Sequence, residues 1–121
     1  MLHRAFGTHT LVPGPNGKTI DEHLGRASSG TDGYSVAHMY APAGWHEPAQ
    51  TADFDEVVML VSGQLAIETE AGTTVVRPGE SARVAAGARV RFRNASADVP
   101  CEYWSLCVPA WRPDRVRIAP E

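Results

Sequence analysis

Cysteine is scarce in this chain of 121 residues, and its placement excludes a disulfide framework. The two cysteines, Cys101 and Cys107, fall in one expected strand. Their even separation puts them on the same face, about 20 Å apart at roughly 3.3 Å per residue. Residues so far apart cannot form a disulfide with each other. We therefore predict two small buried hydrophobic side chains.

The chain also lacks long apolar runs and runs of positive charge. Its longest apolar run, residues 57–61, is far too short to span a bilayer, and residues 1–10 contain no hydrophobic signal region. The formal net charge is -3, and the ten arginines are scattered, with Lys18 as the single lysine. These features argue against a nucleic-acid or membrane partner, and we expect a cytoplasmic protein.

What the sequence has in place of these features is regular turn punctuation. Gly and Pro recur every eight to twelve residues, and the intervening segments are rich in Val, Thr, Ile and Tyr. This pattern is typical of an all-β sandwich or barrel, and the number of segments suits a small jelly roll. The expected strands are 8–12, 17–24, 33–41, 44–50, 55–61, 64–70, 73–77, 82–85, 88–94 and 101–109.

A chain of this length forms one domain with its own core. We divide the single domain, 1–121, into an N-terminal strand arm (1–32), a barrel core (33–109) and a C-terminal tail (110–121). Two prolines, Pro109 and Pro113, prevent the tail from continuing a paired central strand. The tail should therefore wrap around the barrel or reach a neighbouring subunit.

The run Val57–Val61 is apolar at every position, so both faces of its strand should be covered. One face would line the barrel, and the other would meet a second sheet or a partner subunit. Together with Trp111 in the tail, this is more apolar surface than one small barrel can cover. We therefore predict a homodimer.

A motif lies between Gly44 and Gly63, in GWHEPAQTADFDEVVMLVSG. It resembles the first motif of the cupin family: Gly, five residues, His, any residue, His, three residues, Glu, six residues and Gly. Glu56 and Gly63 fit this frame, but Gln50 and Ala52 stand where the two histidines are expected. The resemblance implies a cupin-type double-stranded β-helix, which is a jelly-roll barrel.

The second cupin motif is matched by Gly72, Pro78 and Gly79, with Gly87 and Asn94 downstream in frame. Its metal-binding histidine would fall at Val90. Only Glu56 of the four metal ligands implied by the resemblance is present. We therefore expect no metal and no other cofactor.

A longer resemblance involves DFDEVVMLVSGQLAIE, RPGE and CVPAW, over about 65 residues. These phrases are similar to small single-domain cupins of the ethanolamine-utilisation type. The resemblance is informative about the subfamily and gives little indication of the substrate.

The cupin resemblance places the site inside the barrel, and the strand period of two extends this to neighbouring positions. If Gln50 points inward, then His46, Pro48 and Ala52 do so too, whereas Trp45 and Glu47 face away. The other expected interior side chains are His38, Tyr40, Glu56, Val58, Leu60, Val90 and Phe92. On the last strand, either Tyr103 or Trp104 faces inward.

These side chains suit acid–base chemistry in a mostly apolar pocket. Desolvation should raise the pKa of Glu56 towards that of a useful general base, with His46 or Tyr40 as the acid. The expected substrate-binding residues are His38, Gln50, Val58, Val90, Phe92, Tyr103 and Trp104. The predicted activity is that of an isomerase, lyase or cyclase acting on a small carbonyl-bearing metabolite.

Two alternatives remain open from the sequence. The same pocket could hold a ligand without chemistry, as a binding module. Alternatively, His46 and His38 could join Glu56 around a metal, in the two-histidine, one-carboxylate arrangement of non-haem iron enzymes. His46 could also be an exposed rim residue, and His38 a satisfied core histidine.

Overall fold

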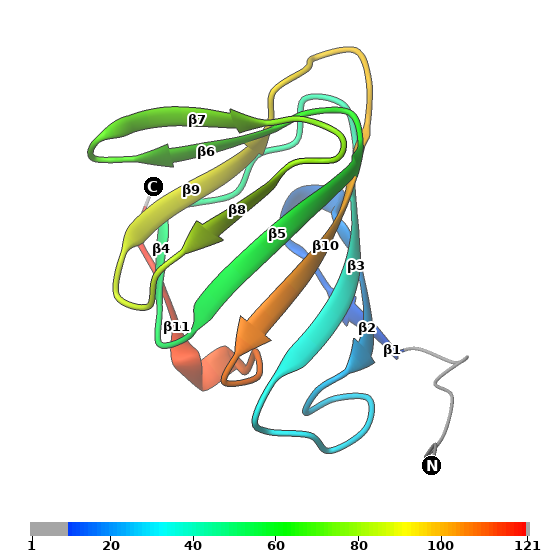
Figure 1. Ribbon diagram of the computed structural model, residues 1–121, viewed down its shortest axis with the longest axis vertical. Coiled ribbons are helices and arrows are strands. Elements are labelled where there is room, and N and C mark those ends of the chain that lie inside the picture. The colour runs from blue at the N-terminus through cyan, green and yellow to red at the C-terminus, as the bar shows by residue number, and fades with distance from the viewer. Residues whose placement is uncertain (1–9, 121) are drawn as a thin grey trace.

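The computed structural model describes residues 10–120, and they form two antiparallel sheets (Figure 1). The six-stranded sheet has the order β1 (Thr10–Pro13), β2 (Thr19–Leu24), β3 (Ser35–Ala41), β10 (Cys101–Val108), β5 (Asp55–Ser62) and β8 (Ser81–Val84). The five-stranded sheet has the order β11 (Val116–Ile118), β4 (Gln50–Ala52), β9 (Arg89–Asn94), β6 (Leu65–Thr69) and β7 (Gly72–Val76). The prediction of an all-β jelly-roll barrel is confirmed.

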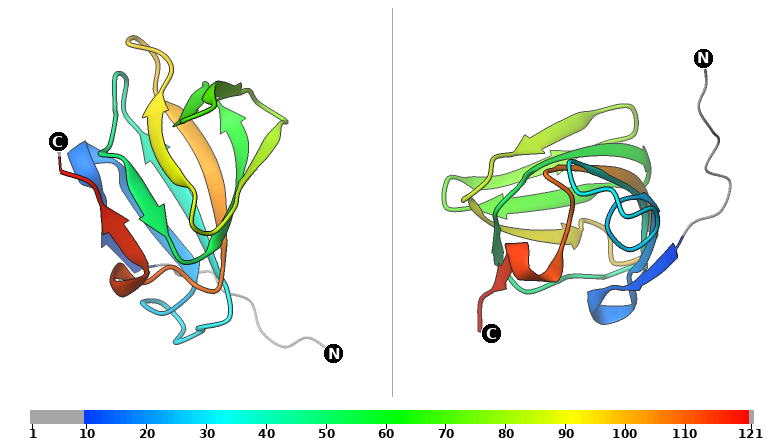
Figure 2. Two further views of the ribbon diagram at one scale, coloured as in Figure 1. Left: turned by 90° about the vertical axis from the view of Figure 1, so that its left-hand side faces the viewer. Right: turned by 90° about the horizontal axis from the view of Figure 1, so that it is seen from below.

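The two sheets wrap around a common axis (Figure 2). Strand β10 lies inside the six-stranded sheet, paired with β3 on one side and β5 on the other. The core consists of inward-facing side chains from both sheets, such as Met39, Val58, Leu65, Phe92 and Tyr103. Alternate residues of each strand therefore reach the interior of the barrel.

Most expected strands are present within a few residues of their predicted ends, but the segment 44–50 is an exception. Here His46 makes only an isolated bridge to Arg93, and strand β4 does not begin until Gln50. Pro48 lies in the gap and has no backbone N–H to donate to a ladder. The irregular stretch before Gln50 changes which side chains face inward.

The N-terminal arm and the tail are both part of the barrel. Strand β2 pairs with β3, so the described part of the arm extends the six-stranded sheet; residues 1–9 lie outside the described range. After a 3₁₀ helix at Pro113–Arg115, the tail adds β11 to the free edge of β4. The tail therefore wraps around its own barrel, which is one of the two predicted outcomes.

Strand β5 has one covered face and one open face. Val58 and Leu60 are buried inside, whereas Met59 and Val61 on the outer face are 38% and 50% exposed. The expectation that a second sheet of this chain could cover the outer face is wrong. Cys101 and Cys107 are both buried and unpaired, as predicted. Among the described residues, no helix is long and apolar enough to span a membrane.

Candidate functional site

Three side chains that were predicted to line the barrel lie on its outside. In β3 every second residue from Ser35 to Ala41 is buried, so His38 and Tyr40 point outward, and Tyr40 is 39% exposed. His46 is exposed, whereas its neighbours Trp45 and Glu47 are buried. The predicted inward positions in β3 were wrong by one residue. A shift of one residue moves every side chain of a strand to the opposite face. For His46 the cause is the irregular segment before Gln50, where a period of two does not apply.

The last strand resolves the choice between Tyr103 and Trp104. Tyr103 is 1% exposed and lies inside, whereas Trp104 packs on the outer face, with its ring centroid 5.1 Å from that of His38. Nε2 of His38 lies 3.1 Å from Oε2 of Glu102, also on that face. Trp104 and His38 are therefore removed from the predicted substrate site. The proposed metal rescue by His46, His38 and Glu56 is also wrong, because both histidines face away from Glu56.

The remaining predicted residues do face the interior. Gln50, Glu56 and Phe92 line a cavity of about 360 Å³, while Val58 and Val90 are buried in the core. The other residues lining the cavity are Pro15, Lys18, Ile20, Met39, Glu47, Phe54, Trp111, Pro113, Val116 and Ile118. This volume is within the usual range for small-molecule sites.

Glu56 occupies a central position in this interior. It lines the main cavity and also a smaller one, of about 40 Å³, that contains Ser105 and Cys107. Oε2 of Glu56 accepts a hydrogen bond of 2.6 Å from the Ser105 hydroxyl. Burial raises the pKa of Glu56, and the opposing effects of Ser105 and Lys18 do not cancel this shift. A carboxyl group with a raised pKa is a stronger base than an exposed one.

Sequence reasoning missed Lys18, which lies inside the barrel and is only 8% exposed. Its Nζ donates a hydrogen bond of 3.2 Å to Oη of Tyr103 and lies 3.6 Å from Oε2 of Glu47. The ammonium group also lies 4.5 Å from the centre of the Trp45 ring, a favourable cation–π distance. Burial alone would lower the pKa of Lys18, but Tyr103 and Glu47 outweigh it and the pKa is raised.

Glu47 was predicted to face away from the barrel, but it is buried inside. Its Oε1 accepts a hydrogen bond of 3.4 Å from Nε2 of Gln50, and its other oxygen faces Lys18. Burial raises the pKa of Glu47, and the charge of Lys18 opposes this rise. The cavity therefore contains one cation and two carboxyl groups.

A signal for Lys18 was present in the sequence. Lys18, Ile20 and Glu22 alternate with a period of two, and in the structure all three belong to the inward face of the N-terminal arm. Lys18 is also the single lysine beside ten arginines. Arginine spreads its charge over a rigid fork, whereas lysine offers a compact charge on a flexible stem that suits a narrow interior.

The residues at the metal-ligand positions of the cupin motifs do not fit a metal. Gln50 lies opposite Val90 in the β4–β9 pairing, and Ala52 has no donor atom. No group of three or more His, Cys, Asp or Glu side chains in residues 10–120 is arranged to hold a metal ion. In addition, the Lys18 ammonium already provides a fixed positive charge in the barrel, which would repel a metal ion.

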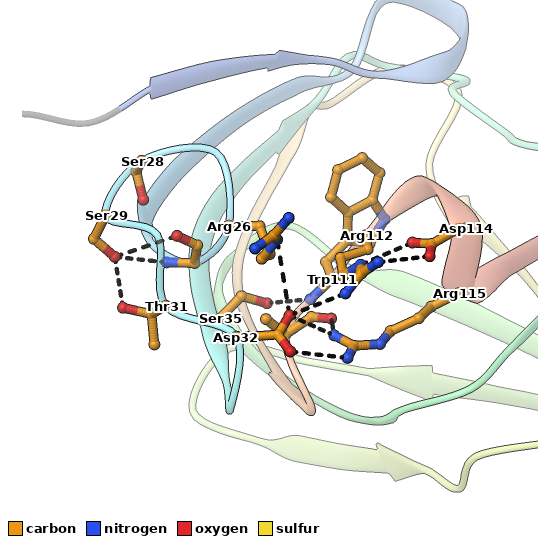
Figure 3. Close-up of polar contacts among 12 residues, drawn as sticks. Arg26, Ser28, Ser29, Thr31, Asp32, Ser35, Trp111, Arg112, Asp114 and Arg115 are labelled. Atoms are coloured by element: carbon orange, nitrogen blue, oxygen red, sulfur yellow. Dashed lines mark hydrogen bonds and ion pairs between the residues drawn. The ribbon is translucent and has the colours of Figure 1, made fainter.

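The C-terminal tail forms one wall of the cavity, through Trp111, Pro113, Val116 and Ile118. The backbone N–H of Trp111 donates a hydrogen bond of 2.9 Å to the hydroxyl of Ser35 in β3 (Figure 3). Trp111 also lines an open hollow on the outside, between Leu11 and Asp114. Trp111 therefore lies between the cavity and this outer hollow.

An ion-pair cluster around Asp32 holds this tail (Figure 3). Asp32 accepts hydrogen bonds from Arg112 and Arg115, and Arg26 lies 3.8 Å away. Arg115 also donates to the carbonyl oxygen of Ala110 at 2.7 Å. We call these residues the Asp32 clasp. It links the loop after β2 to the tail that closes the cavity.

Residues 37–109 match the Cupin domain family, which covers more than half of the chain. The chain belongs to the cupin family. It is also 46% identical over 104 residues to a protein named endoribonuclease YbeY from Myxococcus xanthus (strain DK1622). That alignment covers 86% of this chain but 35% of the relative, so the chain spans about a third of that protein's length.

Solved structures show the same cupin fold at low sequence identity. The polyketide cyclase RemF from Streptomyces resistomycificus has a TM-score of 0.75 at 14% identity, covering 100% of this chain and 87% of RemF. A variant of Streptomyces PAC13 with uridine also has a TM-score of 0.75, at 12% identity and with 98% and 90% coverage. An oxalate oxidase in complex with glycolate has 0.70, at 20% identity, with 88% and 57% coverage.

Proposed function

We propose that this cupin is a metal-independent enzyme that performs acid–base chemistry on a small carbonyl-bearing metabolite in its barrel cavity. The reaction class is isomerase, lyase or cyclase. The observation that carries the proposal is the position of Glu56: its carboxyl group is inside the barrel, faces the cavity and has a raised pKa. The Ser105 hydroxyl binds one of its oxygens, and the side chain remains partly exposed at the cavity.

The comparisons support this proposal by analogy only. One structural neighbour is a polyketide cyclase and another was solved with uridine. A shared fold does not establish a shared reaction. The endoribonuclease name of the Myxococcus relative describes a longer protein, of which the alignment covers 35%.

The acid partner differs from the one expected from sequence, because His46 and Tyr40 lie outside the barrel. Besides the Ser105 hydroxyl that binds Glu56, the interior contains the proton-bearing groups of Lys18 and Tyr103, and both have raised pKa values. They remain protonated at neutral pH. The pocket therefore combines a base with donors that keep their protons.

The proposal is tested with nitrobenzisoxazole, which opens to a coloured phenolate when a buried base removes its ring proton. Glu56→Gln should lower the rate by about 10² to 10⁴, the usual contribution of a positioned base. The matched control is Glu68→Gln in β6, which removes a carboxylate at a partly exposed ion pair with Arg93. The control should keep the wild-type rate.

Equal rates in Glu56→Gln and the wild type would favour the alternative, a binding module without catalysis. That alternative has one supporting observation, since the tail adds apolar side chains to the cavity wall that a ligand could contact. If Glu56→Gln does not fold, Glu56→Asp retains the charge and withdraws it by one methylene. A rate well below wild type in a folded Glu56→Asp would then support the proposal, and an unchanged rate would contradict it.

We also propose that the cupin is a homodimer formed through the outer face of the six-stranded sheet. This face presents Tyr40, Met59, Val61 and Trp104 from three adjacent strands. Aromatic residues and methionine are enriched in protein interfaces. A second copy would cover the outer face of β5, which this chain leaves open.

A further inference from the structure

The barrel holds a fixed ammonium group that the base chemistry of Glu56 does not by itself require. We propose that Lys18 binds the ligand oxygen on which negative charge develops, and that the ligand is an uncharged, enolisable carbonyl compound. This inference rests on the proposed function and adds to it an oxyanion-binding residue and a substrate class.

The surroundings of Lys18 hold its ammonium in place. The indole Nε1 of Trp45 donates a hydrogen bond of 2.7 Å to the carbonyl oxygen of Pro15, and the Asn16 side chain donates to the carbonyl oxygen of His46. These contacts attach the segment before Lys18 to the segment that carries Glu47. A charge fixed before the reaction stabilises a developing opposite charge without the cost of reorganisation.

The ammonium retains bonding capacity for a ligand. An ammonium group has three N–H donors. In the part of the chain that the structure describes, Nζ of Lys18 has one hydrogen-bond partner, Tyr103, and one ion-pair partner, Glu47. Nζ also lies over the Trp45 ring, but no third oxygen or nitrogen acceptor is recorded for it within residues 10–120. Lys18 and Glu56 line the same cavity. A ligand between them would contact a base and a cation at once.

The charges of the cavity select the class of ligand. Among the described residues that line it, the charged side chains are Lys18, Glu47 and Glu56. Two carboxyl groups share one ammonium group in this cavity, so a carboxylate or phosphate ligand would add a third acidic group beside a single cation. A neutral carbonyl oxygen avoids this repulsion and still accepts a hydrogen bond from Lys18. Phe54, Phe92 and Trp111 provide apolar walls for the rest of the molecule.

The step that follows is balanced within the site. Glu56 removes a proton from the carbon next to the carbonyl, so the C–H bond breaks and its electron pair forms a carbon–carbon double bond. The carbonyl π electrons move to the oxygen, which becomes an enolate held by Lys18. Glu56, now a carboxylic acid, returns the proton at another position or to a leaving group. No oxidant or reductant is needed.

The role of Lys18 is tested by equilibrium binding of para-nitrophenol, which absorbs differently as phenol and as phenolate. The titration is done at a pH well below the pKa of the free phenol, in a Glu56→Gln background that removes the carboxylate repulsion. We expect this background to bind the phenolate form. Adding Lys18→Met should weaken phenolate binding by about 10-fold to 100-fold, the contribution of a hydrogen bond from a charged donor.

The matched control is Arg83→Met, which removes one positive charge from an exposed position in β8. It should leave phenolate binding unchanged. Lys18→Met leaves Glu47 buried without its cation, which could destabilise the fold. The same measurement is therefore made on Lys18→Met combined with Glu47→Gln, which leaves no unpaired charge at this pair. Equal phenolate binding with and without Lys18 would overturn the role of Lys18.

The substrate class is tested separately on the wild type with two probes of similar size and shape. Para-nitroacetophenone is neutral and enolisable, whereas para-nitrobenzoate is anionic. We expect the ketone to bind more tightly, and tighter binding of the benzoate would overturn the proposed class. These are binding measurements, so their failure is distinct from failure of the base assignment, which appears only in the nitrobenzisoxazole rates.

Discussion

The Ser105 hydroxyl donates a hydrogen bond of 2.6 Å to Oε2 of Glu56, across the pairing between β10 and β5. The two residues lie on the inner face of adjacent strands, so the backbone ladder fixes the geometry of this contact. The hydrogen bond fixes one carboxylate oxygen. Glu56 also lines the cavity, so its carboxyl group is accessible to a ligand there.

Ser105→Ala should shift the pH dependence of the nitrobenzisoxazole reaction. Burial raises the pKa of Glu56, and the hydrogen bond from Ser105 lowers it. Removing that bond should therefore raise the pKa further. Because the base acts when deprotonated, the acidic limb of the pH–rate profile should move to higher pH, while the plateau rate changes by less than about tenfold.

The control for this experiment is Ser81→Ala, at an exposed position in β8. Its profile should overlay that of the wild type. A Ser105→Ala profile that stays in place or moves to lower pH would show that the hydrogen bond does not tune the base.

Much of the fold could be predicted from local sequence signals. Turn residues recur at strand-length intervals, and the Gly44–Gly63 frame places Glu56 correctly within the motif. The inward positions of Val58, Leu60, Val90 and Phe92 followed from alternation along regular strands. These predictions hold because every second side chain of a regular strand points to the same face along its whole length.

The site was less predictable because the inward or outward facing of its residues had to be extrapolated across irregular segments. The break at Pro48 reverses the expected facing of His46 and Glu47, and nothing local fixes the phase of β3. Lys18 enters the cavity from the position just before β2, which is distant in sequence from both motifs. Its partners Glu47 and Tyr103 lie 29 and 85 positions away, so their association depends on tertiary structure.

Asp32→Asn should loosen the tail that closes the cavity. Hydrogen bonding to Arg115, together with Arg112, lowers the pKa of Asp32, so the stabilising ion pairs are present above the unfolded pKa. They are lost as the pH falls through the folded value. Since the clasp is exposed, added salt should weaken it. We expect faster amide hydrogen exchange in residues 110–118 and little change in Tm.

The control for the clasp is Asp98→Asn, in an exposed loop at the other end of β10. Its exchange in residues 110–118 should equal that of the wild type. High salt or low pH should bring the wild type towards the exchange rates of Asp32→Asn. Unchanged exchange in Asp32→Asn would mean that the pairing of β11 with β4 holds the tail without the clasp.

Met59→Glu should convert the proposed dimer to a monomer. Met59 projects from the outer face of β5, where it is 38% exposed in the single chain. In a dimer with two-fold symmetry each copy contributes the same face, so one substitution places two carboxylates in an apolar interface. Burying unpaired charges there is strongly unfavourable. Sedimentation at micromolar concentration should show a dimer for the wild type and a monomer for the variant.

Thr73→Glu, which adds the same charge to an exposed position in β7, should remain dimeric. A wild-type monomer at that concentration, or a Met59→Glu dimer, would contradict the proposed interface.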